Sequence, residues 1–178
     1  AEDTLEEIPM SRLYSVSPDD RLQLRLHGKG FFFDNARRKH GTLMHEVLSR
    51  IRTPKDIPAS VESYRLAGVI NREEAAELIS RLEELLQAEE VKAWYDGSAR
   101  VLNEVDILFG KGLSKRPDRV IIKGGKVIVV DYKFGERQDK RHPNQVRNYL
   151  QLIRKMGFER VDGYLWYVEL GKIEAVNK

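Results

Sequence analysis

The sequence predicts an α/β fold in which helices cover a mixed central sheet. Helical and strand-like patterns of apolar residues follow one another in the order helix, three strands, helix, strand, over residues 41–51, 100–109, 118–123, 126–133, 143–156 and 161–168. A tight turn joins the second and third strands, which makes them antiparallel. A helix separates the last two strands, and such a connection normally makes strands parallel with a right-handed crossover. The sheet is therefore expected to be mixed, with helices on its faces.

The first core helix is indicated by apolar residues at positions 43, 44, 47, 48 and 51, the spacing of one helix face. Thr53-Pro54 ends it, because the residue before a proline disfavours the helical conformation. Upstream, leucines alternate with polar residues and predict a half-buried strand over residues 21–26. The acidic N-terminal segment, residues 1–20, has no function that we can assign.

Residues 53–98 are predicted to form a helical insert with two helices, over residues 59–67 and 72–91. Asn71 precedes the second helix and Glu74 follows three positions later, which is the spacing of a capping box. The apolar stripe of this helix is more typical of packing than of binding.

Residues 99–178 are predicted to hold the sheet and the second core helix. Pro143 suits the first turn of that helix, and Gly157 suits its end. We expect the whole chain, residues 1–178, to form a single domain.

The hairpin signal is Gly124-Gly125, which joins two apolar runs. A two-residue turn fixes which positions face each other: Lys123 and Lys126, Ile121 and Ile128, and Asp118 and Asp131. Such partners lie on the same face of the sheet, about 4.5–5.5 Å apart. Lys133, two residues beyond Asp131, projects to that face as well.

Two adjacent carboxylates repel each other unless one is protonated or a cation lies between them. Asp118 and Asp131 are hard oxygen ligands of the kind that suits Mg²⁺ or Mn²⁺. The alternative is a pair of surface acids at strand ends, with Lys133 as a salt-bridge partner. Spacing alone leaves both interpretations open.

The first core strand is predicted to alternate along residues 100–109, with Val101, Val105, Ile107 and Phe109 on one face and Leu102, Glu104, Asp106 and Leu108 on the other. An acid between apolar neighbours costs free energy unless it is paired or bound to a metal. Glu104 is therefore a candidate site residue, and Asp106 competes for the same role.

The composition excludes several classes of protein. The chain has 178 residues, 41% of them hydrophobic and 33% charged, which are values of a globular protein. It has no cysteine, which excludes a disulfide scaffold, a thiolate zinc site, a cysteine nucleophile and a cysteine-ligated iron–sulfur cluster. No apolar run approaches the length of a membrane span. These features lead us to expect a cytoplasmic protein without a membrane partner.

Five segments, in order along the chain, resemble a known nuclease family. Pro117-Asp118 and, after twelve intervening residues, Asp131-Tyr132-Lys133 resemble the PD-(D/E)XK nuclease signature. The surrounding segments resemble the RecB-type branch of these nucleases: residues 41–45 its G-x-x-x-H helix, residues 116–120 its second metal-ligand strand, residues 129–135 its D-Y-K-[TF]-G strand, and residues 145–149 its Q-x-x-x-Y helix. The match covers roughly residues 21–176 and implies a restriction-endonuclease-like core. The helical insert is similar to that of the C-terminal nuclease module of UvrD/Rep-type helicase–nucleases.

This resemblance implies roles for particular residues. A divalent metal, Mg²⁺ or Mn²⁺, would be held by His45, Asp118, Asp131, the backbone carbonyl of Tyr132 and a further candidate, Glu104. Lys133 would position the attacking water and stabilise charge in the transition state. Gln145 and Tyr149 share one helix face and would hydrogen-bond the lysine, a ligand water or a DNA phosphate. Without the resemblance, His45 is a hydrogen-bonded or exposed helix residue rather than a ligand, and Gln145 and Tyr149 form a polar helix edge.

The net charge of +3 conceals a basic half, with fourteen Lys and Arg against five Asp and Glu between residues 111 and 160. Charge alone is equally compatible with a solvated surface and with a phosphate-rich partner. Beside the resemblance, it predicts sequence-independent contacts to the DNA backbone from Arg116, Arg119, Arg137, Lys140, Arg141 and Arg147.

We therefore expect a metal-dependent deoxyribonuclease that hydrolyses phosphodiester bonds of single-stranded or linear duplex DNA, as the nuclease module of a helicase–nuclease in DNA repair or recombination. The chain lacks a Walker phosphate-binding loop, so the motor and its nucleotide cofactor are expected outside it. It begins with Ala1 rather than Met, so we expect either an excised fragment of a longer protein or a trimmed product. The alternatives are a catalytically inactive DNA-binding or scaffold module of the same fold and a repair endonuclease of other specificity.

Overall fold

The structure is a computed structural model, and it describes residues 29–109, 113–135, 139 and 141–176. The chain divides into two compact units, residues 1–38 and 39–178. Of the first unit, only the backbone that begins helix α2 is described, and the sheet and the helices that cover it belong to the second unit. The acidic segment 1–20 and the predicted strand 21–26 lie outside the described residues.

Helix α2, Lys29–Arg50, contains the predicted first core helix as its C-terminal half. The helical insert follows, as the 3-10 turn η3 and the helices α3, α4 and α5, over Pro54–Asp56, Ile57–Leu66, Arg72–Leu86 and Glu89–Lys92. The predicted capping box is present: Glu74 N–H donates to Asn71 Oδ1 at 2.9 Å, and Asn71 N–H donates to Glu74 Oε2 at 2.7 Å. The second insert helix ends at Leu86 rather than near residue 91, and α5 continues after a short break.

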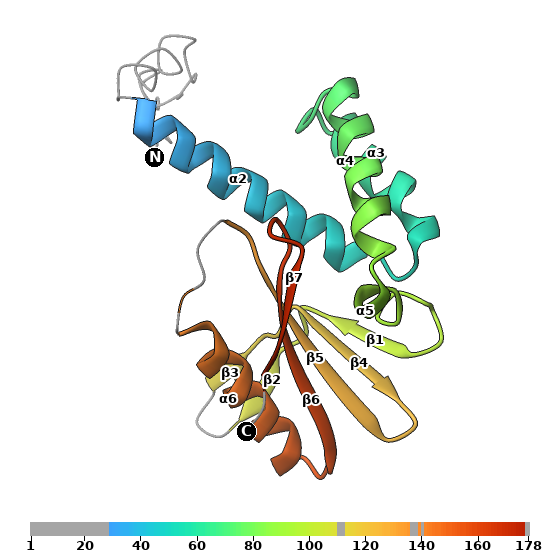
Figure 1. The fold of residues 1–178 in the computed structure, drawn as a ribbon, viewed down its shortest axis with the longest axis vertical. Helices are drawn as coiled ribbons and strands as arrows, with labels where there is room; N and C mark the ends of the chain where they lie inside the picture. The colour runs from blue at the N-terminus through green and yellow to red at the C-terminus, as the bar shows by residue number, and fades with distance from the viewer. Residues whose placement is uncertain (1–28, 110–112, 136–138, 140, 177–178) are drawn as a thin grey trace, which may run out of the picture. The chain divides into compact units, whose positions relative to one another are not determined.

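The central sheet is mixed, as predicted, and its five strands lie in the order β1-β4-β5-β6-β7 (Figure 1). They span Arg100–Asn103, Arg119–Lys123, Lys126–Lys133, Arg160–Tyr167 and Lys172–Val176. The Gly124-Gly125 turn gives the expected register, with Ile121 opposite Ile128. Strands β5 and β6 are parallel and β6 and β7 antiparallel.

The prediction of one strand over residues 100–109 was wrong. Strand β1 ends at Asn103, and β2, Ile107–Phe109, pairs instead with β3, Leu113–Lys115, in a separate two-stranded sheet. The cause is Glu104, whose φ of 49° is incompatible with an extended strand. Its N–H donates to the carbonyl of Asp118 at 3.1 Å. The break leaves Val105 exposed rather than on a packed face.

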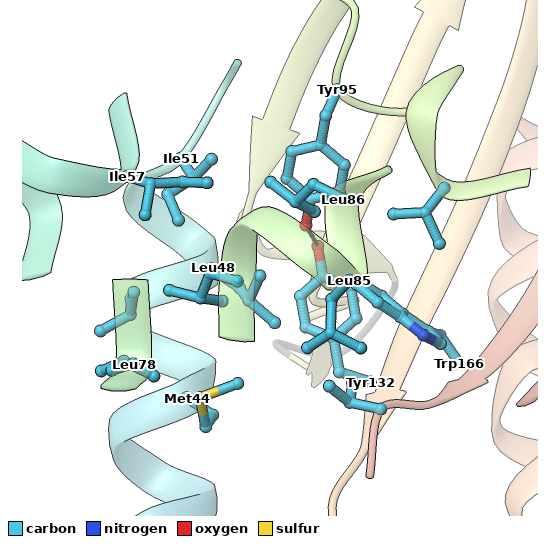
Figure 2. Packing of buried hydrophobic residues seen from close by; sticks show 14 of the residues in the cluster. Met44, Leu48, Ile51, Ile57, Leu78, Leu85, Leu86, Tyr95, Tyr132 and Trp166 are labelled. Carbon is cyan, nitrogen blue, oxygen red and sulfur yellow. Dashed lines mark hydrogen bonds between the residues drawn. The ribbon is translucent and has the colours of Figure 1, made fainter. Parts of the chain in front are cut away.

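Helix α6, His142–Lys155, has Pro143 in its first turn and ends before Gly157, as predicted. It packs on the sheet opposite the other helices. One apolar core joins the C-terminal half of α2 and the insert to the sheet, and Figure 2 shows Leu48, Leu86 and Trp166 within it. The second core joins α6 to the other face. Of the helices that the structure describes, none is both long and apolar enough to pass through a membrane.

Candidate active site

The two predicted acids come together at the open end of the β4–β5 hairpin. The last ladder pair is Arg119 and Val130, so Asp118 and Asp131 occupy the next position. Asp118 Oδ2 accepts the backbone N–H of Tyr132 at 2.6 Å, which holds this carboxylate across the strand end. Asp131 is 2% exposed, and the Lys133 ammonium lies 2.5 Å from its Oδ2. The hairpin therefore brings both acids and the lysine together.

The electrostatics of this pair are unfavourable in the absence of a further cation. Burial, and then the charge of Asp131, raise the pKa of Asp118 to about 7. Asp131 Oδ2 is buried and accepts no well-directed hydrogen bond from the described residues, although Lys133 is close. A buried and a half-buried carboxylate with one nearby ammonium are a donor set that suits a hard divalent cation.

His45 reaches the same acids from helix α2. Its Nδ1 lies 3.4 Å from Asp118 Oδ1, and its ring packs edge-on against Phe134, with the centroids 4.7 Å apart. Burial lowers the pKa of His45 despite the opposing charge of Asp131. The imidazole is therefore neutral near pH 7, which is the form that binds a metal.

His45, Asp118 and Asp131 lie in one region, but their side chains do not converge on a common point that an ion could occupy. In the part of the chain that the structure describes, no three side chains of His, Cys, Asp and Glu are arranged to enclose an ion. Asp118 directs Oδ2 at the Tyr132 amide and Oδ1 at His45. The residue types and burial thus fit a metal, whereas the side-chain conformations pair Asp118 with His45 and Asp131 with Lys133.

Helix α6 brings the two predicted polar residues to the lysine from the other face of the sheet. Lys133 Nζ donates to Gln145 Oε1 at 3.1 Å, Gln145 Nε2 donates to the Tyr149 hydroxyl at 2.8 Å, and that hydroxyl donates to the Arg116 carbonyl at 3.3 Å. This chain of hydrogen bonds links Lys133 to the segment just before Asp118. Lys133 is thus held by Gln145 as well as by Asp131.

Glu104 lies near the site, at the break between β1 and β2. Its charge raises the pKa values of both Asp118 and His45, after the larger effects of burial and Asp131. Asp106, the competing candidate, is exposed. Tyr132 can serve the site only through its backbone, because its side chain is buried on the opposite face, with its hydroxyl 2.8 Å from that of Tyr95.

The predicted DNA-binding residues divide into three groups. Arg116, Arg141 and Arg147 are exposed, and Arg141 is ion-paired with Asp139 at 2.6 Å. Arg137 and Lys140 lie outside the described residues. For Arg119 the prediction was wrong, because its side chain is completely buried and cannot contact DNA.

Sequence reasoning also missed an open groove beside the site. The groove has a volume of about 500 Å³ and is lined by Lys115, Asp139, Arg141, His142, Asn144, Gln145 and Asn148. Gln145 connects it to Lys133. The amides that line it follow one another on α6 at positions 144, 145 and 148, a spacing in the sequence that indicates a shared helix face.

The comparison with protein families now identifies the class of this fold and site. The model of the PD-(D/E)XK nuclease superfamily matches residues 21–178. The chain therefore belongs to the PD-(D/E)XK nuclease superfamily, and its mixed sheet flanked by helices is consistent with the restriction-endonuclease-like fold of that superfamily. A search of the curated proteins finds no match. Members of the superfamily are typically nucleases that use divalent metals, so the family indicates a metal-dependent nuclease that binds DNA.

Proposed function

We propose that this protein is a divalent-metal-dependent deoxyribonuclease that hydrolyses phosphodiester bonds. The observation that carries the proposal is the juxtaposition of Asp118, Asp131 and Lys133 at the open end of one hairpin. Burial and the charge of Asp131 raise the pKa of Asp118, and a cation between the two carboxylates would relieve this repulsion. The family supplies the reaction class.

The residues that would hold Mg²⁺ or Mn²⁺ are His45, Asp118 and Asp131, with the Tyr132 carbonyl and Glu104 as further ligands. When bound, such a metal acidifies a water molecule and neutralises charge on the scissile phosphate. His45 suits this role because it is neutral near pH 7. The two carboxylates would exchange their present contacts, with the Tyr132 amide, His45 and Lys133, for the ion.

Lys133 would stabilise the negative charge that develops on the phosphate during cleavage. Its ammonium is held between Asp131 Oδ2, at 2.5 Å, and Gln145 Oε1, at 3.1 Å. A cation fixed from two sides stabilises negative charge that develops on the phosphate without having to reorganise. Gln145 and Tyr149 would thus act by orienting the lysine.

The DNA strand would approach along the groove beside α6. Arg116, Arg141 and Arg147 would contact phosphates, and so would Arg137 and Lys140, on the sequence argument alone. Such contacts are independent of base sequence and weaken as the salt concentration rises.

We further propose a RecB-type nuclease module that receives linear or single-stranded DNA from a helicase and acts in DNA repair or recombination. The support is the order of the His45, Asp118, Lys133 and Gln145–Tyr149 motifs, together with the helical insert between α2 and β1. A motor elsewhere would supply translocation, because this chain has no Walker loop.

The second candidate function is a catalytically inactive DNA-binding or scaffold module. One observation favours it: within the described residues, no three candidate ligands already surround a common point. The completeness of the acid, lysine and glutamine set favours the active enzyme.

The experiment compares cleavage of labelled linear single-stranded and duplex DNA in Mg²⁺, Mn²⁺ or EDTA. Asp131→Asn and Lys133→Met are expected to abolish metal-dependent cleavage. Lys126→Met is the matched control, since Lys126 lies at the hairpin turn and pairs with Asp162. Cleavage that persists in EDTA, or in both site variants, would refute the metal site. A wild-type protein that binds DNA but cleaves nothing with any metal, also when the full helicase-containing protein is tested, would establish the scaffold function.

A further inference from the structure

Arg119 is a completely buried cation that pairs with no carboxylate among the described residues. Its Nη1 donates to the Ile51 carbonyl and its Nη2 to the Trp94 carbonyl, each at 2.9 Å. The guanidinium carbon lies 3.8 Å above the centre of the Tyr95 ring. The charge is therefore compensated by carbonyl dipoles and an aromatic face, an arrangement that a surface arginine does not need.

Two of the carbonyls that this network binds, those of Ser49 and Ile51, lie at the end of helix α2. The last carbonyls of a helix have no partner within the helix and carry partial negative charge. Asn103 Nδ2 donates to the Ser49 carbonyl at 2.5 Å, and Asn103 Oδ1 accepts from Arg119 Nη1 at 3.3 Å. Side chains from β1 and β4 thus fasten the end of α2 to the sheet. We call Arg119 and Asn103 the helix clamp.

The helix clamp joins the segments of the chain that carry two of the candidate metal ligands, Asp118 and His45. Arg119 directly follows Asp118 in the chain, and His45 lies less than two turns before the clamped end of α2. Because a helix is stiff over this length, fixing its end also fixes where His45 stands relative to Asp118. The present separation is 3.4 Å, from Nδ1 to Oδ1.

A second connection runs from the clamp to the other strand of the hairpin. Tyr95, on which the guanidinium stacks, has its hydroxyl 2.8 Å from that of Tyr132, and Figure 2 shows the two rings meeting end to end within the core. The Tyr132 N–H in turn donates to Asp118. The Arg119 guanidinium therefore contacts the end of α2, which carries His45, and the Tyr95 ring, which is linked through Tyr132 to Asp118.

We propose that Arg119 is a positioning residue, which with Asn103 sets the distance between His45 and the carboxylates. Its effect on metal binding rests on the proposed nuclease function, whereas its effect on the placement of His45 does not. Groups that hydrogen-bond to metal ligands typically change metal affinity by about 10–100-fold when they are replaced. Arg119 and Asn103 act through the end of α2, so we expect an effect at the lower end of that range. Arg119→Lys retains the charge but cannot donate to two carbonyls in the same fork geometry.

The test is a calorimetric titration of the protein with Mn²⁺ at a temperature where urea unfolding shows every variant to be folded. Arg119→Lys and the milder Asn103→Ala are expected to weaken binding by about 10-fold. Each is then combined with His45→Ala, in which the same changes should have less than a 2-fold effect. Arg154→Lys is the matched control, because Arg154 donates to a single carbonyl, that of Val161, on the α6 side of the sheet.

The outcomes separate this inference from the proposed function. If Arg119→Lys and Asn103→Ala weaken Mn²⁺ binding equally with and without His45→Ala, the clamp does not position His45 and only stabilises the fold. If the wild type binds no Mn²⁺, the proposed metal site is refuted. The placement of His45 by the clamp is then tested by the imidazole NMR resonances of the metal-free protein. Arg119→Lys and Asn103→Ala must then shift the His45 resonances and leave those of His142 in place; unchanged His45 resonances would overturn it.

Discussion

Gly163 in β6 allows helix α6 to lie directly on the sheet, and its replacement by alanine gives a quantitative prediction. A Cβ atom at this position would lie 2.6 Å from Val146 Cγ1 and 3.0 Å from both methyl carbons of Leu150. Carbon atoms are in favourable contact at about 3.5–4.0 Å, so α6 must move outward by roughly 1 Å. Val146 cannot yield alone, since it is β-branched and completely buried. We expect Gly163→Ala to lower the free energy of unfolding by about 2 kcal/mol, as overpacked cores do.

Urea unfolding, followed by the fluorescence of the buried Trp94 and Trp166, measures this loss. The decisive comparison is with Val146→Ala, which removes the methyl group that the new Cβ meets. Alone, Val146→Ala should cost about 2 kcal/mol through lost packing; in the Gly163→Ala background it should cost less than half of that. Equal costs in the two backgrounds, or a Gly163→Ala loss below about 0.5 kcal/mol, would refute the reasoning. DNA cleavage should fall in parallel, because α6 carries Gln145 away from Lys133.

Two more predictions concern the hairpin. Asp118→Asn retains an oxygen for the Tyr132 N–H but removes a carboxylate whose pKa is raised to about 7. Because the folded wild type holds its proton more tightly than the unfolded chain, its stability falls as the pH rises from about 4 to 7. In EDTA the variant should therefore match the wild type near pH 4 and exceed it at pH 8, by up to about 4 kcal/mol; equal urea midpoints at pH 8 would contradict this. Tyr132→Phe leaves the buried Tyr95 hydroxyl without its partner and should cost about 1–3 kcal/mol. Adding Tyr95→Phe should recover part of that loss, whereas strictly additive losses would show that the hydroxyls do not interact.

The features that local sequence determines were predicted well. Gly124-Gly125 predicted the register of β4 and β5, and with it the meeting of Asp118 and Asp131, because a two-residue turn leaves one way to pair the strands. Asn71 and Glu74 predicted the start of α4 for the same local reason. The four-residue spacing of Gln145 and Tyr149 predicted a shared face, and the structure adds the order of their hydrogen bonds.

The features that sequence reasoning missed depend on contacts between distant segments. The apolar alternation continues through Glu104, so nothing in the sequence marks the left-handed residue that divides the strand. Arg119 has the sequence pattern of a surface residue at a strand end. Its burial depends on carbonyls at residues 51 and 94, which only the folded chain brings together. The roles of the site residues in catalysis stay predictions.

The placement of both acids on one hairpin also affects how the chain folds. A hairpin closes a short loop and forms within about 1–10 μs, well before contacts between distant segments. We therefore expect Asp118 and Asp131 to meet early in folding, before α2 brings His45 and before α6 holds Lys133 through Gln145. At neutral pH both are ionised in the unfolded chain, and their repulsion opposes hairpin closure. The proximity that prepares these acids for a cation thus places an electrostatic barrier at one of the first steps of folding.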